Sequence, residues 1–264
     1  MAGEEHLTLK GKRAVVTGAG RGIGHSIALA LAQAGADVAV TARTASEIEQ
    51  LAGQLQAMGR KSLAVPCDVT SMEQVQHMAK TCLEALNGVD ILVNNAGNAR
   101  SHKFLNHPDD LWQYMLSVNL TSVYFVTKAF TQTLIDQRGG RIINIASTAS
   151  RVGSRYTSAY TAAKHGVLGL TRALAVELTP YNITVNAICP GYVDTPLTDY
   201  SVSNMVGRTG MTEAQARETL AKMSPQHRLI EPDEIAALAV FLAQESSKSI
   251  TGQAINIDGG GVMS

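Results

Sequence analysis

The chain has 264 residues, 45% of them hydrophobic, which is enough apolar content for the core of one large α/β domain. Lysine and arginine together number 22, as do aspartate and glutamate, so no net charge would attract nucleic acid or an anionic membrane. No apolar run approaches the roughly 18 to 20 residues that cross a bilayer, and the first residues lack the apolar region of a signal peptide. We therefore expect a cytoplasmic protein that acts on a small molecule, with no nucleic-acid or membrane partner.

Short apolar segments rich in β-branched residues alternate with longer segments of helical periodicity. The expected strands cover residues 13–17, 37–41, 62–66, 90–94, 140–146, 183–189 and 253–258. The expected helices lie near residues 23–34, 45–58, 71–86, 109–136, 158–180 and 232–244. Because parallel strands need crossover helices, this alternation predicts an α/β fold, a doubly wound parallel sheet of about seven strands with helices on both faces.

Neither a linker nor a shift in composition divides the chain, so residues 1–264 are expected to form a single domain. One irregular segment, at about 196–230, follows Pro190-Gly191 and interrupts the alternation of strands and helices. Long insertions at the carboxyl ends of parallel strands commonly cover ligands. We therefore predict that this segment is a substrate lid.

The metal-binding residue types show no site pattern. The three cysteines, Cys67, Cys82 and Cys189, are odd in number, far apart and set in apolar surroundings, and the seven histidines lack the spacing of metal ligands. We expect reduced core cysteines and no metal.

The segment TGAGRGIG, residues 17–24, joins the first expected strand to the first expected helix. Glycines at such a junction let backbone amides approach a phosphate at a helix N-terminus, where the helix dipole favours negative charge. The spacing differs from GxGxxG because Ile23 stands at the third glycine position, and no GK[ST] sequence follows that would indicate a P-loop. The segment therefore predicts a dinucleotide-phosphate site built on Gly18, Gly22 and Gly24.

Five motifs in register extend this interpretation. They are TGxxxGxG at 17–24, Asn94-Asn95-Ala96-Gly97, Ser147, Tyr160-xxx-Lys164 and Pro190-Gly191. In order and separation they closely resemble the short-chain dehydrogenase/reductase family, over about residues 8–262. The resemblance implies a Rossmann-like sheet, an oxidoreductase that uses NAD or NADP, and assembly as a homotetramer or a dimer.

The resemblance also implies positions along the cofactor. The residues concerned are Gly18, Arg21, Gly22, Ile23, Gly24, Arg43, Asp68, Val69, Asn95, Ala96, Gly97, Tyr160, Lys164, Pro190, Gly191, Val193 and Thr195.

The end of the second expected strand bears on the choice of cofactor. In an NAD site an acidic residue about twenty positions after the glycine turn binds the ribose hydroxyls. Here the strand ends Thr41-Ala42-Arg43, with no acid at Ala42. A guanidinium can pair with a 2′-phosphate, and Arg21 offers a second cation, so NADP(H) is favoured while NAD remains open.

The reaction itself needs a proton donor, because hydride transfer to a carbonyl builds negative charge on its oxygen. A tyrosine and a lysine four residues apart share one face of a helix, where the ammonium would lower the pKa of the phenol. The resemblance implies that Tyr160 is the acid/base, that Lys164 tunes it and holds the nicotinamide ribose, that Ser147 binds the substrate oxygen, and that Asn119 anchors a relay water. Tyr156, one turn before Tyr160, is expected only to line the cleft.

The substrate is the least determined feature. Its pocket is expected to be walled by Asn98 and its neighbours, by residues 148–152 including Ala149, by Tyr192 and by the lid, with Arg151 as the one charge in the walls. Such walls favour a neutral carbonyl substrate, for example of the 3-oxoacyl type. An NAD-dependent polyol, sugar or hydroxy-acid dehydrogenase stays open, as does, more remotely, a dinucleotide sensor without turnover. The tyrosine and lysine motif disfavours a methyltransferase.

Overall fold

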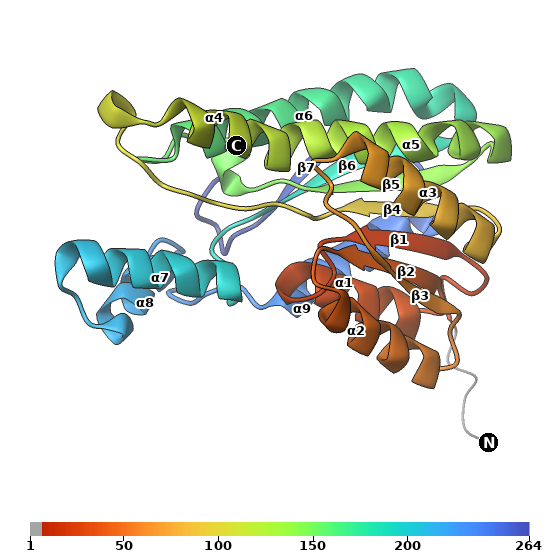
Figure 1. Ribbon diagram of the computed structural model, residues 1–264, viewed down its shortest axis with the longest axis horizontal. Coiled ribbons are helices and arrows are strands. Elements are labelled where there is room, and N and C mark those ends of the chain that lie inside the picture. Colours follow the sequence, from red (N-terminus) through yellow and green to blue (C-terminus); the bar gives the residue numbers. More distant parts are fainter. Residues whose placement is uncertain (1–6, 264) are drawn as a thin grey trace.

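The computed structural model describes residues 7–263 and contains one parallel sheet in the order β3-β2-β1-β4-β5-β6-β7 (Figure 1). The strands are β1 (Arg13–Thr17), β2 (Asp37–Ala42), β3 (Ser62–Pro66), β4 (Ile91–Asn94), β5 (Gly140–Ile145), β6 (Ile183–Pro190) and β7 (Ala254–Ile257). The sheet order reverses its direction between β1 and β4, and ligands of open α/β sheets bind where this happens, at the carboxyl ends of the strands. The predicted fold class is confirmed, and every predicted strand is present.

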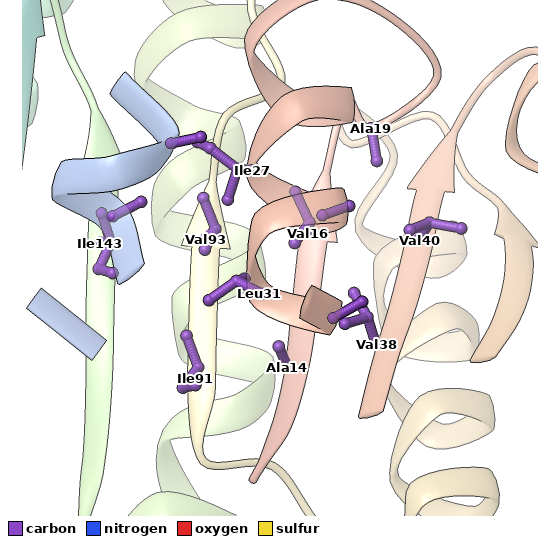
Figure 2. Close-up of a cluster of buried hydrophobic side chains, with 14 of the residues drawn as sticks. Ala14, Val16, Ala19, Ile27, Leu31, Val38, Val40, Ile91, Val93 and Ile143 are labelled. Carbon is purple, nitrogen blue, oxygen red and sulfur yellow. The ribbon is translucent and has the colours of Figure 1, made fainter. Parts of the chain in front are cut away.

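Helices cover both faces of the sheet (Figure 1). On one face lie α1 (Gly22–Gln33), α2 (Ala45–Ala57) and α9 (Pro232–Ala243); on the other lie α3 (Met72–Leu86), α4 (Asp109–Leu116), α5 (Ser122–Gln137) and α6 (Ser158–Leu178). Successive strand residues point to opposite faces, so β1 gives Val16 to one core and Val15 to the other. Figure 2 shows Val16 and its β4 neighbour Val93 packed with Ile27 and Leu31 of α1.

The predicted helix at 109–136 is interrupted. Between α4 and α5 the residues Ser117–Thr121 form a π-helical turn, and this turn contains Asn119. Such turns occur frequently at functional sites, and they rotate the side chains that follow relative to a regular helix. Short 3₁₀ turns flank several other elements, at Phe104–Asn106, Thr148–Ser150, Thr179–Tyr181 and Glu245–Ser247.

The segment predicted to be irregular at about 196–230 is mostly helical. It contains α7 (Pro196–Thr209) and α8 (Glu213–Ala221), which project from the sheet-containing body (Figure 1). A small core of Val202, Ala216 and Leu220 holds the two helices together. We refer to residues 194–229 as the α7–α8 segment.

Both ends of the α7–α8 segment are joined at its base. Val193 and Ile230 form an isolated parallel bridge, in which Ile230 N donates to Tyr192 O at 2.9 Å and Asp194 N donates to Ile230 O at 2.9 Å. Arg217 of α8 forms ion pairs with Asp194, at 2.7 Å, and with Asp199. In the part of the chain that the structure describes, no helix has the length and apolarity to span a bilayer.

Candidate active site

One cleft of about 1430 Å³ lies where the carboxyl ends of β1 and β4 meet the α7–α8 segment. Most of the residues predicted to bind the cofactor, the substrate or the reacting atoms line it. The exceptions are Gly24 of the glycine turn, and Ser150 and Arg151 of the predicted substrate walls. The topology therefore brings together motifs that are up to about 170 residues apart in the sequence.

The glycine turn after β1 is shaped by positive φ angles at Gly18, 64°, and at Gly22, 57°, which residues with a Cβ rarely adopt. A Cβ at Gly18 would also lie 2.8 Å from Ala96 Cα, so the turn and the Asn95-Ala96-Gly97 segment pack backbone to backbone. A Cβ at Gly24 would collide with the carbonyl of Gly18. Because no side chain projects from these glycines, the backbone amides of the turn form a cradle that a phosphate can approach.

Thr17 fixes the two loops against each other. Its Oγ1 accepts hydrogen bonds from Asn95 N at 3.0 Å and Ala96 N at 3.1 Å, and it donates to Val93 O at 3.3 Å. The Asn95 amide donates to Thr17 O and Gly18 O, both at 3.0 Å. The sequence analysis assigned no role to Thr17; its position at the end of a strand, directly before the glycine turn, was the available signal.

Arg43 and Asp68 line the other end of the cleft from the reacting residues. Burial alone would raise the pKa of Asp68, but hydrogen bonds from Thr70 and the nearby Arg43 guanidinium lower it overall. Arg43 is exposed, and Arg21 is the N-cap residue of α1. Gly20 and Glu47, which were not predicted from the sequence, also line the cleft, and a Cβ at Gly20 would collide with the Glu47 carboxylate.

Ser147, Tyr160 and Lys164 meet at the centre of the cleft. Ser147 follows β5 and accepts a hydrogen bond from Ala149 N at 3.1 Å, while Tyr160 and Lys164 lie one turn apart in α6. The buried Lys164 Nζ donates to Ile145 O at 2.8 Å and lies 5.8 Å from the centroid of the Tyr160 ring.

The ionisation of the pair differs from the expected lowering of the tyrosine pKa by lysine. Burial raises the pKa of Tyr160, and the hydrogen bond with Ser147 opposes this rise only in part. Burial also lowers the pKa of Lys164 to about 8. Desolvation disfavours the charged form of either group, which explains both directions. Near neutral pH Tyr160 is therefore a protonated phenol.

Asn119 is fully buried in the π-helical turn. Its Nδ2 donates to Met115 O at 3.0 Å, and its Oδ1 accepts from Asn98 N at 3.1 Å. A Cβ at Gly97 would lie 2.8 Å from the same Oδ1 and 3.8 Å from Lys164 Nζ. The Asn119 side chain is therefore fixed by backbone groups at both its oxygen and its nitrogen, on the side of Gly97 that Lys164 also approaches.

The nicotinamide end predicted for Pro190 to Thr195 is also ordered by backbone contacts. Gly191 N donates to Ile257 O at 2.9 Å, and Thr195 Oγ1 donates to Val193 O at 3.3 Å. Thr195 is the N-cap residue of α7 and faces the glycine turn, because a Cβ at Gly22 would lie 3.1 Å from its methyl carbon.

The substrate walls require two corrections. The Arg151 guanidinium donates to Ala254 O and does not line the cleft, whereas Arg100, Lys103, Arg155 and Arg208 do. The prediction of a single charge in the walls was wrong. Arg100 and Lys103 follow Asn98 in the segment after β4, Arg155 follows residues 148–152, and Arg208 belongs to α7 in the predicted lid.

Tyr156 lines the cleft as predicted, at 49% exposure, but it precedes α6. Its φ of 67° is left-handed, so it does not share the helical face of Tyr160 and Lys164. Of the predicted substrate contacts, Asn98 donates to the Tyr114 hydroxyl at 3.1 Å, and Ala149 and Tyr192 are partly exposed to the cleft. Within residues 7–263, no three His, Cys, Asp or Glu side chains come together as a metal site.

The model of the short chain dehydrogenase family matches residues 12–205. The chain therefore belongs to the short-chain dehydrogenase/reductase family, enzymes that act on CH–OH and ketone groups with NAD(P).

Individual members of the family match nearly the whole chain. The chain is 38% identical to the 3-oxoacyl-(acyl-carrier-protein) reductase of Synechocystis sp., over 95% of this chain and 96% of that protein. It is 37% identical to the D-beta-hydroxybutyrate dehydrogenase of Rhizobium meliloti, over 94% of this chain and 98% of that protein. A solved structure of the actinorhodin polyketide ketoreductase with NADPH has a TM-score of 0.91 and 34% identity, over 94% of this chain and 96% of that one.

Proposed function

We propose that the protein is an NADPH-dependent reductase of ketones of the 3-oxoacyl type. The observation that carries the proposal is the convergence of Ser147, Tyr160 and Lys164 beside the glycine turn in one cleft. The cofactor fits these residues, because the missing Cβ atoms at Gly18 and Gly22 leave a backbone cradle at the start of α1. When bound, the nicotinamide supplies the hydride.

The residues of the chain have the remaining tasks. Tyr160 is protonated near neutral pH and so donates the proton to the developing alkoxide, since burial raises its pKa. The Ser147 hydroxyl donates a hydrogen bond to the same oxygen, which stabilises charge that exists only in the transition state. Lys164 holds the ribose of the cofactor, and Asn119 positions a water that returns the proton to Tyr160.

The preference for NADPH follows from charge at the far end of the cleft. Arg21 and Arg43 both line that end, and a guanidinium binds a phosphate through two parallel hydrogen bonds. The Glu47 carboxylate lies against Gly20 in the same region and repels a phosphate. The attraction of the two arginines for the phosphate must therefore exceed this repulsion. The actinorhodin ketoreductase, which is similar along nearly its whole length, was solved with NADPH.

The proposed substrate class rests on the relatives, two of which are named for 3-oxoacyl or polyketide reduction.

We also propose a homotetramer or a dimer. Tyr124 on α5, Val176 on α6 and Phe241 on α9 are exposed, with 80% exposure at Val176, and association through these helices would cover them. Light scattering coupled to size exclusion gives the assembly state.

The test is a panel of ketones with NADPH, followed by the loss of cofactor absorbance, in wild type and in Tyr160→Phe. The ring of phenylalanine keeps the packing but has no proton to donate, so we expect turnover to fall by at least about a hundredfold. Undiminished turnover in Tyr160→Phe contradicts the mechanism. Faster turnover with an alcohol and NAD than with any ketone contradicts the proposed direction and cofactor.

A further inference from the structure

Four cations gather on the substrate side of the cleft. Arg100 and Lys103 belong to the chain between β4 and α4, Arg155 to the loop before α6, and Arg208 to the end of α7. We call these four residues the basic rim. Among the described residues that line the cleft, the acids are Glu47 and Asp68, and both lie at the opposite, glycine-turn end. The rim is therefore a region of positive charge only, in a chain whose formal net charge is +0.

Two of these guanidinium groups are fixed in position. The Arg100 guanidinium stacks over the Tyr200 ring of α7, 4.1 Å from its centroid, and Arg208 donates one hydrogen bond to Ser101 O at 3.3 Å. These contacts cross the cleft mouth in opposite directions, from the β4–α4 chain to α7 and from α7 back to that chain.

The side chains of the basic rim have hydrogen-bond donors that are available to a ligand. Across residues 7–263, none of its four members forms an ion pair with an acid. An arginine carries five N–H donors in a planar fork, so the single bond of Arg208 to Ser101 leaves most of them for a ligand. An anion bound in the cleft is attracted by each of these cations.

We propose that the basic rim binds an oxyanion at the end of the substrate remote from the reacting carbonyl. This inference rests on the proposed function and narrows its substrate class from ketones of the 3-oxoacyl type to those that carry an anionic tail. The shared chemistry is a phosphate or a carboxylate: the phosphate would belong to a carrier that holds a 3-oxoacyl thioester, and the carboxylate to a free 3-oxo acid. A guanidinium fork pairs with both.

A purely structural role makes a different prediction. If Arg100 and Arg208 only fasten α7 to the β4–α4 chain, their loss affects every ketone alike, charged or neutral. If they bind an anion, their loss changes the ratio between charged and neutral substrates. The discriminating quantity is therefore the ratio of kcat/KM values for two matched ketones.

The kinetic experiment uses two matched pairs with NADPH. The first compares 3-oxobutanoyl-CoA with the uncharged 3-oxobutanoyl-N-acetylcysteamine thioester, and the second compares acetoacetate with methyl acetoacetate. Wild type should prefer the anionic member of one pair, which identifies the source of the oxyanion. Arg208→Gln and Arg100→Gln should each lower that preference by about ten- to a hundredfold, as expected for one lost charge-assisted hydrogen bond. Arg172→Gln, an exposed position on α6 outside the cleft, is the control for net charge and should keep the wild-type ratio.

A second measurement needs neither turnover nor a variant that folds well. Calorimetric titration of the wild-type complex with saturating NADP⁺, which cannot reduce a ketone, should show tighter binding of 4′-phosphopantetheine than of pantetheine, or of acetoacetate than of methyl acetoacetate, and added salt should reduce the difference.

The outcomes separate the two proposals. Reduction of the neutral ketones with no anionic preference, or equal losses for both members of a pair in the arginine variants, overturns the basic rim and leaves the proposed function standing. Anion binding without reduction of any ketone supports the rim and overturns the proposed function. Neither reduction nor anion binding overturns both.

Discussion

Tyr160 and Lys164 show how burial sets the direction of proton transfer at a single pair of residues. Burial raises the pKa of the phenol and lowers that of the ammonium to about 8, so both shifts favour the neutral forms. The phenol is therefore a proton donor near neutral pH, as a reduction requires. The ammonium keeps most of its charge there, and it is fixed by its bond to Ile145 O.

The shift at Lys164 predicts a dependence of stability on pH. Below a pH of about 8 both the folded and the unfolded state carry the proton, and the cost of burying the charge is present in full. Between about 8 and 10.5 the unfolded state still binds the proton that the folded state has lost, so stability gains from this residue as pH rises. We expect the unfolding temperature of wild type, relative to Lys164→Met, to increase from pH 8 to 10. A constant difference across this range contradicts the shift.

Arg43 predicts the discrimination between the two cofactors. In Arg43→Asp a carboxylate replaces the guanidinium, so the variant loses a phosphate partner and gains a repulsion. We expect the Kd of NADPH to rise by at least about tenfold and that of NADH to change much less. Fluorescence titration measures both constants. The same charge change in Arg172→Asp should leave both unchanged, and equal losses for the two cofactors at Arg43 would refute the assignment.

At the scale of one helix, the start of α1 depends on a close approach that only glycine permits. In Gly24→Ala the new methyl group meets the Gly18 carbonyl, which is backbone and cannot rotate away. We expect a loss of roughly 1–3 kcal/mol in the free energy of unfolding, together with weaker cofactor binding, because the turn must open.

Gly53 supplies a matched control for this prediction. It lies inside α2, is exposed, and has nothing within 4 Å of a Cβ. Gly53→Ala should therefore stabilise the protein by about 0.5–1 kcal/mol through the helix propensity of alanine. Chemical denaturation gives both values. Similar effects of the two substitutions would mean that the contact between Gly24 and Gly18 is not limiting.

The sequence predicted regular elements well and irregular ones poorly. The sheet strands and their crossover helices follow from hydrophobic periodicity, which is local. The π-helical turn at Ser117–Thr121 adds one residue to a turn without changing the apolar pattern enough to be recognised. The two helices of the α7–α8 segment were missed because they are largely polar: Val202, Ala216 and Leu220 bury only a short stretch of each helix.

At the scale of the molecule, the order of the strands assembles the site. Strand β4 lies beside β1, so the Asn95-Ala96-Gly97 segment meets the glycine turn. The backbone amides of Asn95 and Ala96 both donate hydrogen bonds to the Thr17 hydroxyl. The positions expected for the cofactor and the reacting residues each follow a strand end or occupy a helix register, and this is why their meeting in one cleft could be predicted, whereas their roles stay predictions. The basic rim could not be predicted, since Arg100, Arg155 and Arg208 come together only through the path of loops and α7.

The bridge between Val193 and Ile230 makes the α7–α8 segment a cassette whose length is uncoupled from the sheet. Its ends stay adjacent whatever the chain does between them, so extra residues there cost only the weak logarithmic entropy of a longer loop. Eight Gly and Ser residues inserted after the exposed Gly210, between α7 and α8, should shift the unfolding temperature little. The same insertion after Gly191 should lower it strongly, because it detaches Tyr192, whose carbonyl accepts a hydrogen bond from Ile230 N, from the end of β6. Related chains could then exchange this cassette, and with it their substrate preference, without redesigning the cofactor half.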